Sequence, residues 1–195
     1  FELIFITGHT NTDKLIKQIN KYVPKFACLS DSSKYKDFKS QTISTNILSG
    51  EKGLEDLCSL DVDIVLNAIS GYKGLSLSVA LLKRGIDLAL SNKESIVQAG
   101  SILNKLSMKN DAKIFPVDSE HSALWQCIIG EDSKNIRRLI LTGSGGPFRN
   151  TKKELFNTIT KEQALKHPNW AMGNKITIDS ATMMNKGFEV IEAHW

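Results

Sequence analysis

Two acidic residues follow an apolar stretch near the middle of the chain. Residues Lys113–Val117 have the composition of a strand, and Asp118 and Glu120 come next, separated by Ser119. In extended backbone, residues two apart point to the same side, so both carboxylates can face one point. Mg²⁺ and Mn²⁺ prefer oxygen ligands and commonly keep positions open for water or substrate. The spacing suits two ligands of a divalent metal site, but the segment taken alone favours the other interpretation, in which Asp118 or Ser119 caps a helix over Glu120–Ile129.

A second polar group falls on one face of a helix predicted over Thr182–Trp195. At helical spacing the polar residues Asn185, Lys186, Glu189 and Glu192 share this face, opposite Met184, Phe188 and Ile191. The polar face could give a third carboxylate, an ammonium and an amide to one anionic, metal-bound ligand. The alternative is a solvated face whose Lys186–Glu189 pair contributes only ~0.3 kcal/mol. Gly187 costs about 1 kcal/mol relative to Ala inside a helix, which favours the close approach of a neighbour.

Between these two groups lies a segment rich in glycine, proline and charge. Gly143–Gly146 is followed by Pro147 and not by a helix, so it is typical of a loop hinge and not of a phosphate-binding turn. Residues 144–173 then carry His167, Trp170 and Met172. This composition predicts a lid that excludes water from a site, or else an ordinary surface excursion whose tryptophan packs on the body.

The first two thirds of the chain alternates apolar, β-prone runs with helical patterns, which predicts an α/β fold with a doubly wound, Rossmann-like parallel sheet. We expect strands at Leu3–Thr7, Lys25–Leu29, Ile64–Ala68, Asp87–Leu90, Lys113–Val117, Arg138–Thr142 and Lys175–Asp179. We expect helices at Asp13–Tyr22, Ser33–Phe38, Leu54–Leu60, Leu75–Arg84, Glu94–Met108 and Glu120–Ile129. Residues 1–117 would form this domain, and residues 118–195 the start of an α/β catalytic domain that includes the lid.

Composition narrows the class of protein. The 195 residues are 41% hydrophobic and 24% charged, as in an ordinary globular protein. The net charge of +4 is dispersed and only 7% of residues are aromatic, which argues against a nucleic-acid partner. No apolar run approaches the roughly 20 residues of a membrane span. The three cysteines have no metal-type spacing and are predicted to be buried, reduced thiols.

The chain has the pattern of a piece of a longer polypeptide. It starts in a strand pattern at Phe1 and stops in a helix pattern at Trp195, without start or stop signals. No G-x-G-x-x-G motif precedes Asn11. If the sheet binds a dinucleotide, we therefore expect its glycine-rich first turn upstream of Phe1.

Five motifs together resemble one family, 1-deoxy-D-xylulose 5-phosphate reductoisomerase. They are Asn92–Ser95, Pro116–His121, Leu141–Arg149, His167–Gly173 and Asp179–Gly187. The likeness is strong from about Ile64 onward and only topological before it. The resemblance implies an enzyme that uses NADPH and Mg²⁺ or Mn²⁺, with Co²⁺ as a further candidate. It would convert 1-deoxy-D-xylulose 5-phosphate to 2-C-methyl-D-erythritol 4-phosphate in non-mevalonate isoprenoid biosynthesis.

The resemblance also implies roles for single residues. The metal ligands would be Asp118, Glu120 and Glu189, and the catalytic residues Lys93, Glu120 and His167. The substrate would be bound by Ser119, Ser144, Trp170, Met172, Ser180, Asn185, Lys186 and Glu189. The cofactor side would comprise Gly8, His9, Asn11, Gly71, Asn92, Glu94 and Gly173.

Other readings stay open at this point. A metal-dependent sugar-phosphate isomerase or aldolase without redox function would use the same carboxylates, lysines and lid. A non-catalytic anion- or nucleic-acid-binding module is suggested only by the pI of about 8.9. The resemblance further implies a homodimer for the full-length protein, no membrane partner, and a bacterial cytoplasm or plastid stroma as its location. We expect this chain alone to have little or no turnover.

Overall fold

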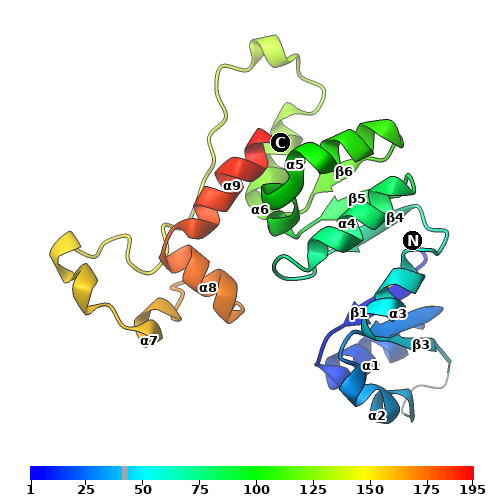
Figure 1. Ribbon diagram of the computed structural model, residues 1–195. Coiled ribbons are helices and arrows are strands. Elements are labelled where there is room, and N and C mark those ends of the chain that lie inside the picture. The colour runs from blue at the N-terminus through cyan, green and yellow to red at the C-terminus, as the bar shows by residue number, and fades with distance from the viewer. Residues whose placement is uncertain (41–43) are drawn as a thin grey trace. The chain divides into compact units, whose positions relative to one another are not determined.

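The computed structural model describes residues 1–40 and 44–195 (Figure 1). The strands are β1 (Phe5–Gly8), β2 (Phe26–Leu29), β3 (Asn46–Ser49), β4 (Ile64–Asn67), β5 (Asp87–Leu90) and β6 (Ile114–Pro116). The α-helices are α1 (Thr12–Tyr22), α2 (Tyr35–Ser40), α3 (Gly50–Leu57), α4 (Gly74–Lys83), α5 (Lys93–Lys109), α6 (Ser119–Ile128), α7 (Lys161–Ala164), α8 (Asn174–Ala181) and α9 (Met184–His194). Short 3₁₀ turns span Ser32–Lys34, Ser133–Asn135 and Lys153–Thr158. Within the described ranges, no helix is long and apolar enough to cross a membrane.

The contacts divide the chain into two units, Phe1–Val65 and Leu66–Trp195. In the first unit, β1, β2 and β3 form a parallel sheet in that order. Its core is a cluster of apolar side chains from α1, β2 and α2: Leu15, Ile19, Ala27, Leu29 and Phe38. Asn11 caps α1, because its side-chain oxygen accepts a hydrogen bond from the main-chain N of Lys14 at 3.0 Å. This unit is the Rossmann-like β-α-β pattern that the sequence predicts.

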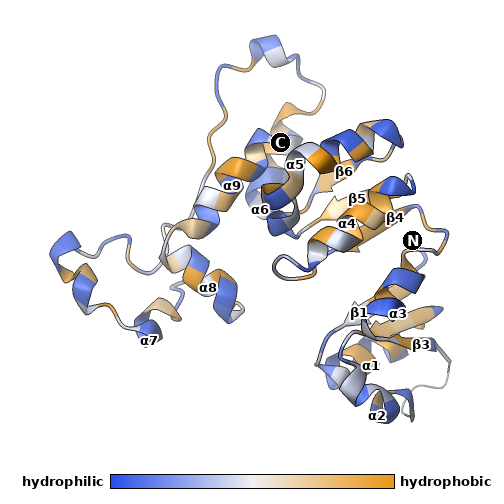
Figure 2. Cartoon of the chain, viewed as in Figure 1, coloured by the Kyte–Doolittle hydropathy of each residue, from blue (hydrophilic) through white to orange (hydrophobic). Residues whose placement is uncertain are grey.

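A second sheet has the order β4-β5-β6, and its strands β5 and β6 run parallel with Leu88 beside Ile114. The residues of β4 and β5 are mainly hydrophobic (Figure 2). Leu88 and Leu90 of β5 are buried. Helix α5 starts three residues after β5, and α6 starts three residues after β6. The polar residues at these two helix starts therefore meet at the same edge of the sheet, where ligands bind in such folds.

Helix α9 lies along α5 (Figure 1). The indole of Trp195 sits against Gly100, where a Cβ would overlap the ring. Asn104 donates a hydrogen bond to the main-chain oxygen of Trp195 at 2.9 Å. These contacts fix the last turn of α9 on α5. The first turns of α9 are positioned by the polar groups described below.

The α/β class is confirmed, with three local exceptions. Segment 138–142 forms no strand: Leu139 and Ile140 are 51% and 63% exposed, and no described strand pairs with the segment. Segment 175–179 lies within α8, where Lys175 and Asp179 form an i,i+4 ion pair at 2.8 Å. Strand β3 was not predicted from the sequence. The functional boundary expected between residues 117 and 118 stays a prediction.

The cysteines follow the sequence prediction only in part. Cys28 and Cys58 are buried, whereas Cys127 is exposed. The prediction for Cys127 was wrong because it lies on a face of α6 that packs against little else, although its neighbours in sequence are apolar. Burial, with a smaller effect of the Asp56 charge, raises the pKa of the Cys28 thiol to about 11. Cys28 is therefore an inert core residue.

Candidate metal and substrate site

Three carboxylates converge in the second unit. Asp118 and Glu120 flank the start of α6, and Glu189 comes from the middle of α9. Each of the three offers an oxygen, and these oxygens lie within 4.8 Å of one another. Glu189 is fully buried, which is costly for a carboxylate unless a positive charge lies nearby.

Two lysines supply positive charge to these carboxylates. The ammonium of Lys93 lies 2.5 Å from Oδ2 of Asp118 and 3.2 Å from Oε1 of Glu189. Lys186 lies 3.2 Å from Oε1 of Glu120, and it pairs with Glu189 and with the main-chain oxygen of Thr142. Burial opposes the charge on Lys93, but the hydrogen bonds and charges of Asp118 and Glu189 outweigh it, so the pKa of Lys93 is raised.

The donor set fits a hard divalent cation. All three groups that converge are carboxylates, the ligands that Mg²⁺ and Mn²⁺ prefer. Three carboxylates against two ammonium groups leave an excess of one negative charge, which favours the entry of a cation. Asp118, Glu120 and Glu189 would hold it. A bound cation would displace the ammonium groups from between the oxygens.

A pocket of about 280 Å³ opens beside the carboxylates. Its lining includes every residue expected to bind metal or substrate or to act in catalysis: Lys93, Asp118, Ser119, Glu120, Ser144, His167, Trp170, Met172, Ser180, Asn185, Lys186 and Glu189. This volume is at the lower end of the range for small-ligand pockets. Residues from 93 to 189 thus meet in one pocket within the second unit.

The glycine loop Gly143–Gly146 forms one wall of the pocket. Gly146 has φ 68°, and a Cβ there would lie 2.5 Å from the main-chain oxygen of Ser180. Opposite, Met183 adopts the left-handed conformation with φ 62° at the junction between α8 and α9. Ile176 and Met183 also line the pocket, and sequence reasoning missed both. Nothing in the local pattern marks them, because Ile176 falls in the strand predicted over Lys175–Asp179 and Met183 in the predicted last helix, each as an ordinary apolar residue.

His167 connects the long excursion to the glycine loop. Its Nε2 lies 3.3 Å from Oγ of Ser144. Its Nδ1 accepts hydrogen bonds from the main-chain N of Asn169 and of Trp170, both at 3.2 Å. The Trp170 ring stacks on the imidazole with centroids 5.0 Å apart. Trp170 is 60% exposed while it lines the pocket, so it does not pack into the body, and its role as a lid stays a prediction.

The residues expected on the cofactor side fall into two groups. Gly8, His9 and Asn11 lie in the first unit, at the carboxyl end of β1, where Nδ1 of His9 is 2.8 Å from Oγ of Ser30. In the second unit are Gly71, Asn92, Glu94 and, just before α8, Gly173. None of these lines the pocket. Their role toward a cofactor stays a prediction.

The amide of Asn92 is already occupied inside the protein. Its Nδ2 donates to the main-chain oxygens of Ile69 and Gly71 at 2.5 and 2.8 Å, and to Glu94 at 3.1 Å. Its Oδ1 accepts from the main-chain N of Ser95 at 3.1 Å, which caps α5. Asn92 therefore positions the loop after β4 beside the start of α5.

The polar face of α9 is the buried face. Glu189 and Glu192 are 0% and 6% exposed, whereas Met184 and Ile191 on the apolar face are 52% and 42% exposed. Asn185 also turns inward, because its Nδ2 donates to Glu189 at 2.5 Å. The alternative interpretation, a solvated polar face, is thus wrong. A Cβ at Gly187 would meet only Sδ of Met184, at 3.9 Å, so no close neighbour explains this glycine among the described residues.

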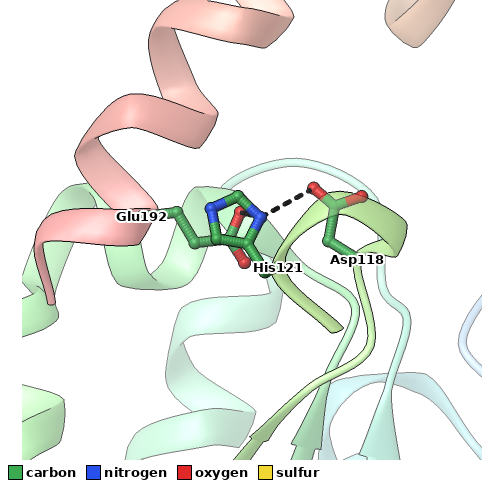
Figure 3. A group of neighbouring side chains, drawn as sticks. All are labelled: Asp118, His121 and Glu192. Carbon is green, nitrogen blue, oxygen red and sulfur yellow. Dashed lines mark ion pairs between the residues drawn. The ribbon is translucent and has the colours of Figure 1, made fainter. Parts of the chain in front are cut away.

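A second group lies beneath the carboxylates: Asp118, His121 and Glu192 (Figure 3). Nδ1 of His121 is 3.4 Å from Oε2 of Glu192 and 3.8 Å from Oδ2 of Asp118. Burial is the main cause that raises the pKa of Glu192 to about 8, and the nearby Asp118 charge adds to it. Glu192 therefore keeps its proton in a pH range in which an exposed glutamate is ionised.

This raised pKa predicts a pH dependence of stability. The folded pKa of Glu192 lies above its ordinary value of 4.5, so its contribution is fully present below pH 4.5 and is lost as pH rises through about 8. Each pH unit is worth about 1.4 kcal/mol. We would measure the free energy of unfolding in urea between pH 5 and 8, with a chelator present, for the unsubstituted protein and for Glu192→Gln. Over this range the unsubstituted protein should lose about 3 kcal/mol more than the variant. Parallel pH profiles for the two proteins would contradict this assignment.

Fold and pocket together define an α/β protein with a carboxylate and lysine pocket at the carboxyl ends of a parallel sheet. Residues 1–100 match the family described as 1-deoxy-D-xylulose 5-phosphate reductoisomerase. Residues 114–195 match the C-terminal domain of the same family. The chain therefore belongs to the 1-deoxy-D-xylulose 5-phosphate reductoisomerase family.

Relatives of that name agree over the whole chain. The protein of Thermoanaerobacter pseudethanolicus is 49% identical, and the match covers 100% of this chain and 51% of the relative. The Bacillus subtilis protein is 47% identical, with 100% and 52% covered. The chain thus spans about half the length of the curated relatives that it matches.

Solved structures of this family share the fold. A crystal structure of a DOX-P reductoisomerase in complex with NADPH, fosmidomycin and magnesium has a TM-score of 0.88 and 39% identity, covering 98% of this chain and 50% of that one. The enzyme from Zymomonas mobilis in complex with NADPH has a TM-score of 0.87 and 37% identity, with 99% and 50% covered.

Proposed function

We propose that this chain is the part of an NADPH- and divalent-metal-dependent reductoisomerase that holds the metal and the substrate. The reaction is the rearrangement and reduction of 1-deoxy-D-xylulose 5-phosphate to 2-C-methyl-D-erythritol 4-phosphate. The observation that carries the proposal is the convergence of Asp118, Glu120 and Glu189 with Lys93 and Lys186 in one pocket. Support comes from family membership and from relatives solved with NADPH and magnesium.

The proposed chemistry divides the pocket into two parts. Asp118, Glu120 and Glu189 would hold Mg²⁺ or Mn²⁺, which as a Lewis acid supplies stabilisation of alkoxide charge on the substrate's oxygens. Lys93 and Lys186 lie against the same carboxylates and add positive charge for an anionic substrate.

The other wall suits the phosphate. The hydroxyls of Ser144 and Ser180 line the pocket and can donate hydrogen bonds to phosphate oxygens, and the amide of Asn185 lines it beside them. His167 and Trp170 cover the opening, which keeps water away from a reactive aldehyde. The pocket is too small to hold a dinucleotide as well. NADPH would therefore have to bind outside it, and the residues that we assign to the cofactor are Gly8, His9, Asn11, Gly71, Asn92, Glu94 and Gly173.

The remaining assignments of the family are proposals of the same kind. We assign a homodimer to the full-length protein, and the bacterial cytoplasm or plastid stroma as its location. The chain alone is expected to be inactive, since the relatives are about twice as long. Size-exclusion chromatography with light scattering on a full-length version would test the dimer.

The test of the proposed function is turnover in a protein completed to the length of its relatives. With Mn²⁺ and 1-deoxy-D-xylulose 5-phosphate, we expect NADPH oxidation that falls at least about 100-fold in Glu120→Gln, because loss of even an outer partner of a metal ligand costs 10–100-fold. Glu131→Gln, an exposed site beyond α6, is the matched control and should keep full turnover.

The outcomes separate the competing functions. Product formed without loss of NADPH would replace the reductoisomerase by a non-redox isomerase or aldolase. If the folded protein binds Mn²⁺ but does not convert this substrate, the proposed substrate is wrong and the metal site serves another one.

A further inference from the structure

One imidazole joins the two helices that carry the carboxylates. His121 of α6 is 7% exposed, and its Nε2 lies 2.8 Å from the main-chain oxygen of Glu189 in α9. A carbonyl oxygen only accepts hydrogen bonds, so Nε2 must carry the ring proton and donate it. The contact bridges 68 residues of sequence. The peptide group of one expected metal ligand is thus held by a side chain from the helix that carries the other two.

The other ring nitrogen faces two carboxyl groups. This atom, Nδ1, lies 3.4 Å from Oε2 of Glu192 and 3.8 Å from Oδ2 of Asp118 (Figure 3). Nδ1 and Oε2 of Glu192 are buried, and neither makes a hydrogen bond of normal length among the described residues. The imidazole is therefore enclosed between Glu192 on one side and the ligand Asp118 on the other.

We propose that His121, backed by Glu192, is a positioning residue that sets the distance between Asp118 and Glu189 in the metal site. The inference rests on the proposed function, because it requires that these carboxylates bind a metal ion. A ligand set is effective only when its atoms are held to within about 0.5 Å. His121 touches the side chain of one ligand and the main chain of another, so it constrains both.

The rest of α9 does not depend on this contact. Its last turn is fixed to α5 by the packing of Trp195 on Gly100 and by the bond from Asn104. Without His121, α9 should stay attached at that end while the turn that carries Glu189 gains freedom. The expected defect is a loss of metal affinity in a folded protein, which differs from the loss of stability that a purely structural histidine would give.

Charge argues against a second cation between His121, Asp118 and Glu192. With every group ionised, the four carboxylates of both clusters and the two lysines leave an excess of two negative charges. One divalent cation neutralises this excess, and a second would leave the buried cluster with two positive charges. His121 and Glu192 are thus better assigned to support of one ion than to a second one.

The test measures Mn²⁺ binding, by electron paramagnetic resonance, to the completed full-length protein without substrate. We expect one site whose affinity falls about 10- to 100-fold in His121→Phe, which removes both ring nitrogens. His121→Gln places its amide nitrogen near the position of Nε2 and should bind within about 3-fold of the unsubstituted protein. His194→Phe replaces an exposed histidine at the end of α9; it is the control and should leave the affinity unchanged. Melting temperatures are recorded for all variants.

Three results would overturn the inference. The first is an unchanged Mn²⁺ affinity in a folded His121→Phe protein. The second is an affinity in His121→Gln as low as in His121→Phe. The third is a second equivalent of metal, lost in both variants, which would make His121 a ligand. Should His121→Phe not fold, Glu192→Leu tests the same support and should weaken binding about 10-fold. No Mn²⁺ binding by the unsubstituted protein would overturn the proposed metal site itself.

Discussion

Glu189→Gln is expected to remove metal binding while the protein still folds. The amide is a weaker ligand than a carboxylate, and it donates where the cation needs a negative oxygen. Because the metal-free cluster has more negative than positive charge, loss of one carboxylate also relieves repulsion, so the free energy of unfolding without metal should change little. The large effect falls on affinity, which we expect to drop at least about 100-fold.

Thermal unfolding with and without Mn²⁺ measures this effect. A ligand present at 100 times its dissociation constant stabilises the folded state by about 2.7 kcal/mol, and a 100-fold weaker site loses most of that gain. Glu131→Gln is the matched control, since it removes an exposed carboxylate beyond α6 without touching the three expected ligands. Full Mn²⁺ stabilisation in Glu189→Gln would rule out Glu189 as a ligand.

Gly146→Ala is expected to disrupt the wall of the pocket. With φ 68°, an L-residue there is strained by about 1–2 kcal/mol. In addition, the new Cβ would lie 2.5 Å from the main-chain oxygen of Ser180. Because both atoms are held by the backbone, the glycine loop or the end of α8 would have to shift. Since a displacement of 1 Å in a binding site can cost 10²-fold in rate, we expect a loss of about that size in turnover of the completed protein, and a lower melting temperature.

A control variant, Gly130→Ala, separates the effect of backbone strain from that of the steric clash with Ser180. Gly130→Ala introduces the same backbone strain at φ 82°, but a Cβ there meets nothing within 4 Å. We expect a loss of about 1 kcal/mol in stability and no loss of turnover in that variant. If the two alanine variants behave alike, the contact between the glycine loop and α8 does not shape the pocket.

The sequence was sufficient where local chemistry decides the structure. Asp118 caps α6, as one interpretation of the acidic pair predicts, and its carboxylate also lies near those of Glu120 and Glu189. Its role as a metal ligand stays a prediction. The parallel strands were predictable because buried β-prone runs alternate with helical patterns. Every residue assigned to substrate or metal through the five motifs lies in one pocket. Two of these motifs, Asn92–Ser95 and Pro116–His121, start helices directly after strands at one edge of the sheet.

The sequence was insufficient where a partner decides the structure. Segment 138–142 has strand composition, but a strand needs a neighbour, and no described strand pairs with it. In segment 175–179 the alternation of polar and apolar residues predicted a strand. The ion pairs of Lys175 with Glu94 and Asp179 instead suit a helix, and Glu94 lies 81 residues away.

Helix α9 shows the same limit for burial. Amphipathic patterns predict that the apolar face is the buried one. Here polar partners from distant helices lie against this face of α9: Lys93 pairs with Glu189, and the imidazole of His121 lies beside Glu192. The two acidic side chains are therefore buried among polar partners, and no count of apolar residues within α9 could have indicated it. The role of His121 was likewise invisible, because its partner is a main-chain oxygen 68 residues away.

The hydrogen bonds of His167 determine whether the glycine loop presents a donor or an acceptor to the pocket. Nδ1 of His167 accepts from two main-chain N–H groups, so its proton resides on Nε2 and points to Ser144. Oγ of Ser144 accepts from this ring and from the main-chain N of Gly146 at 3.2 Å. Both acceptor positions of the hydroxyl are then filled, and only its hydrogen remains to be used. The last group in this series of hydrogen bonds is the hydroxyl of Ser144, which can only donate to a ligand. This wall of the pocket therefore favours ligands that accept a hydrogen bond, such as an anion, over ligands that donate one.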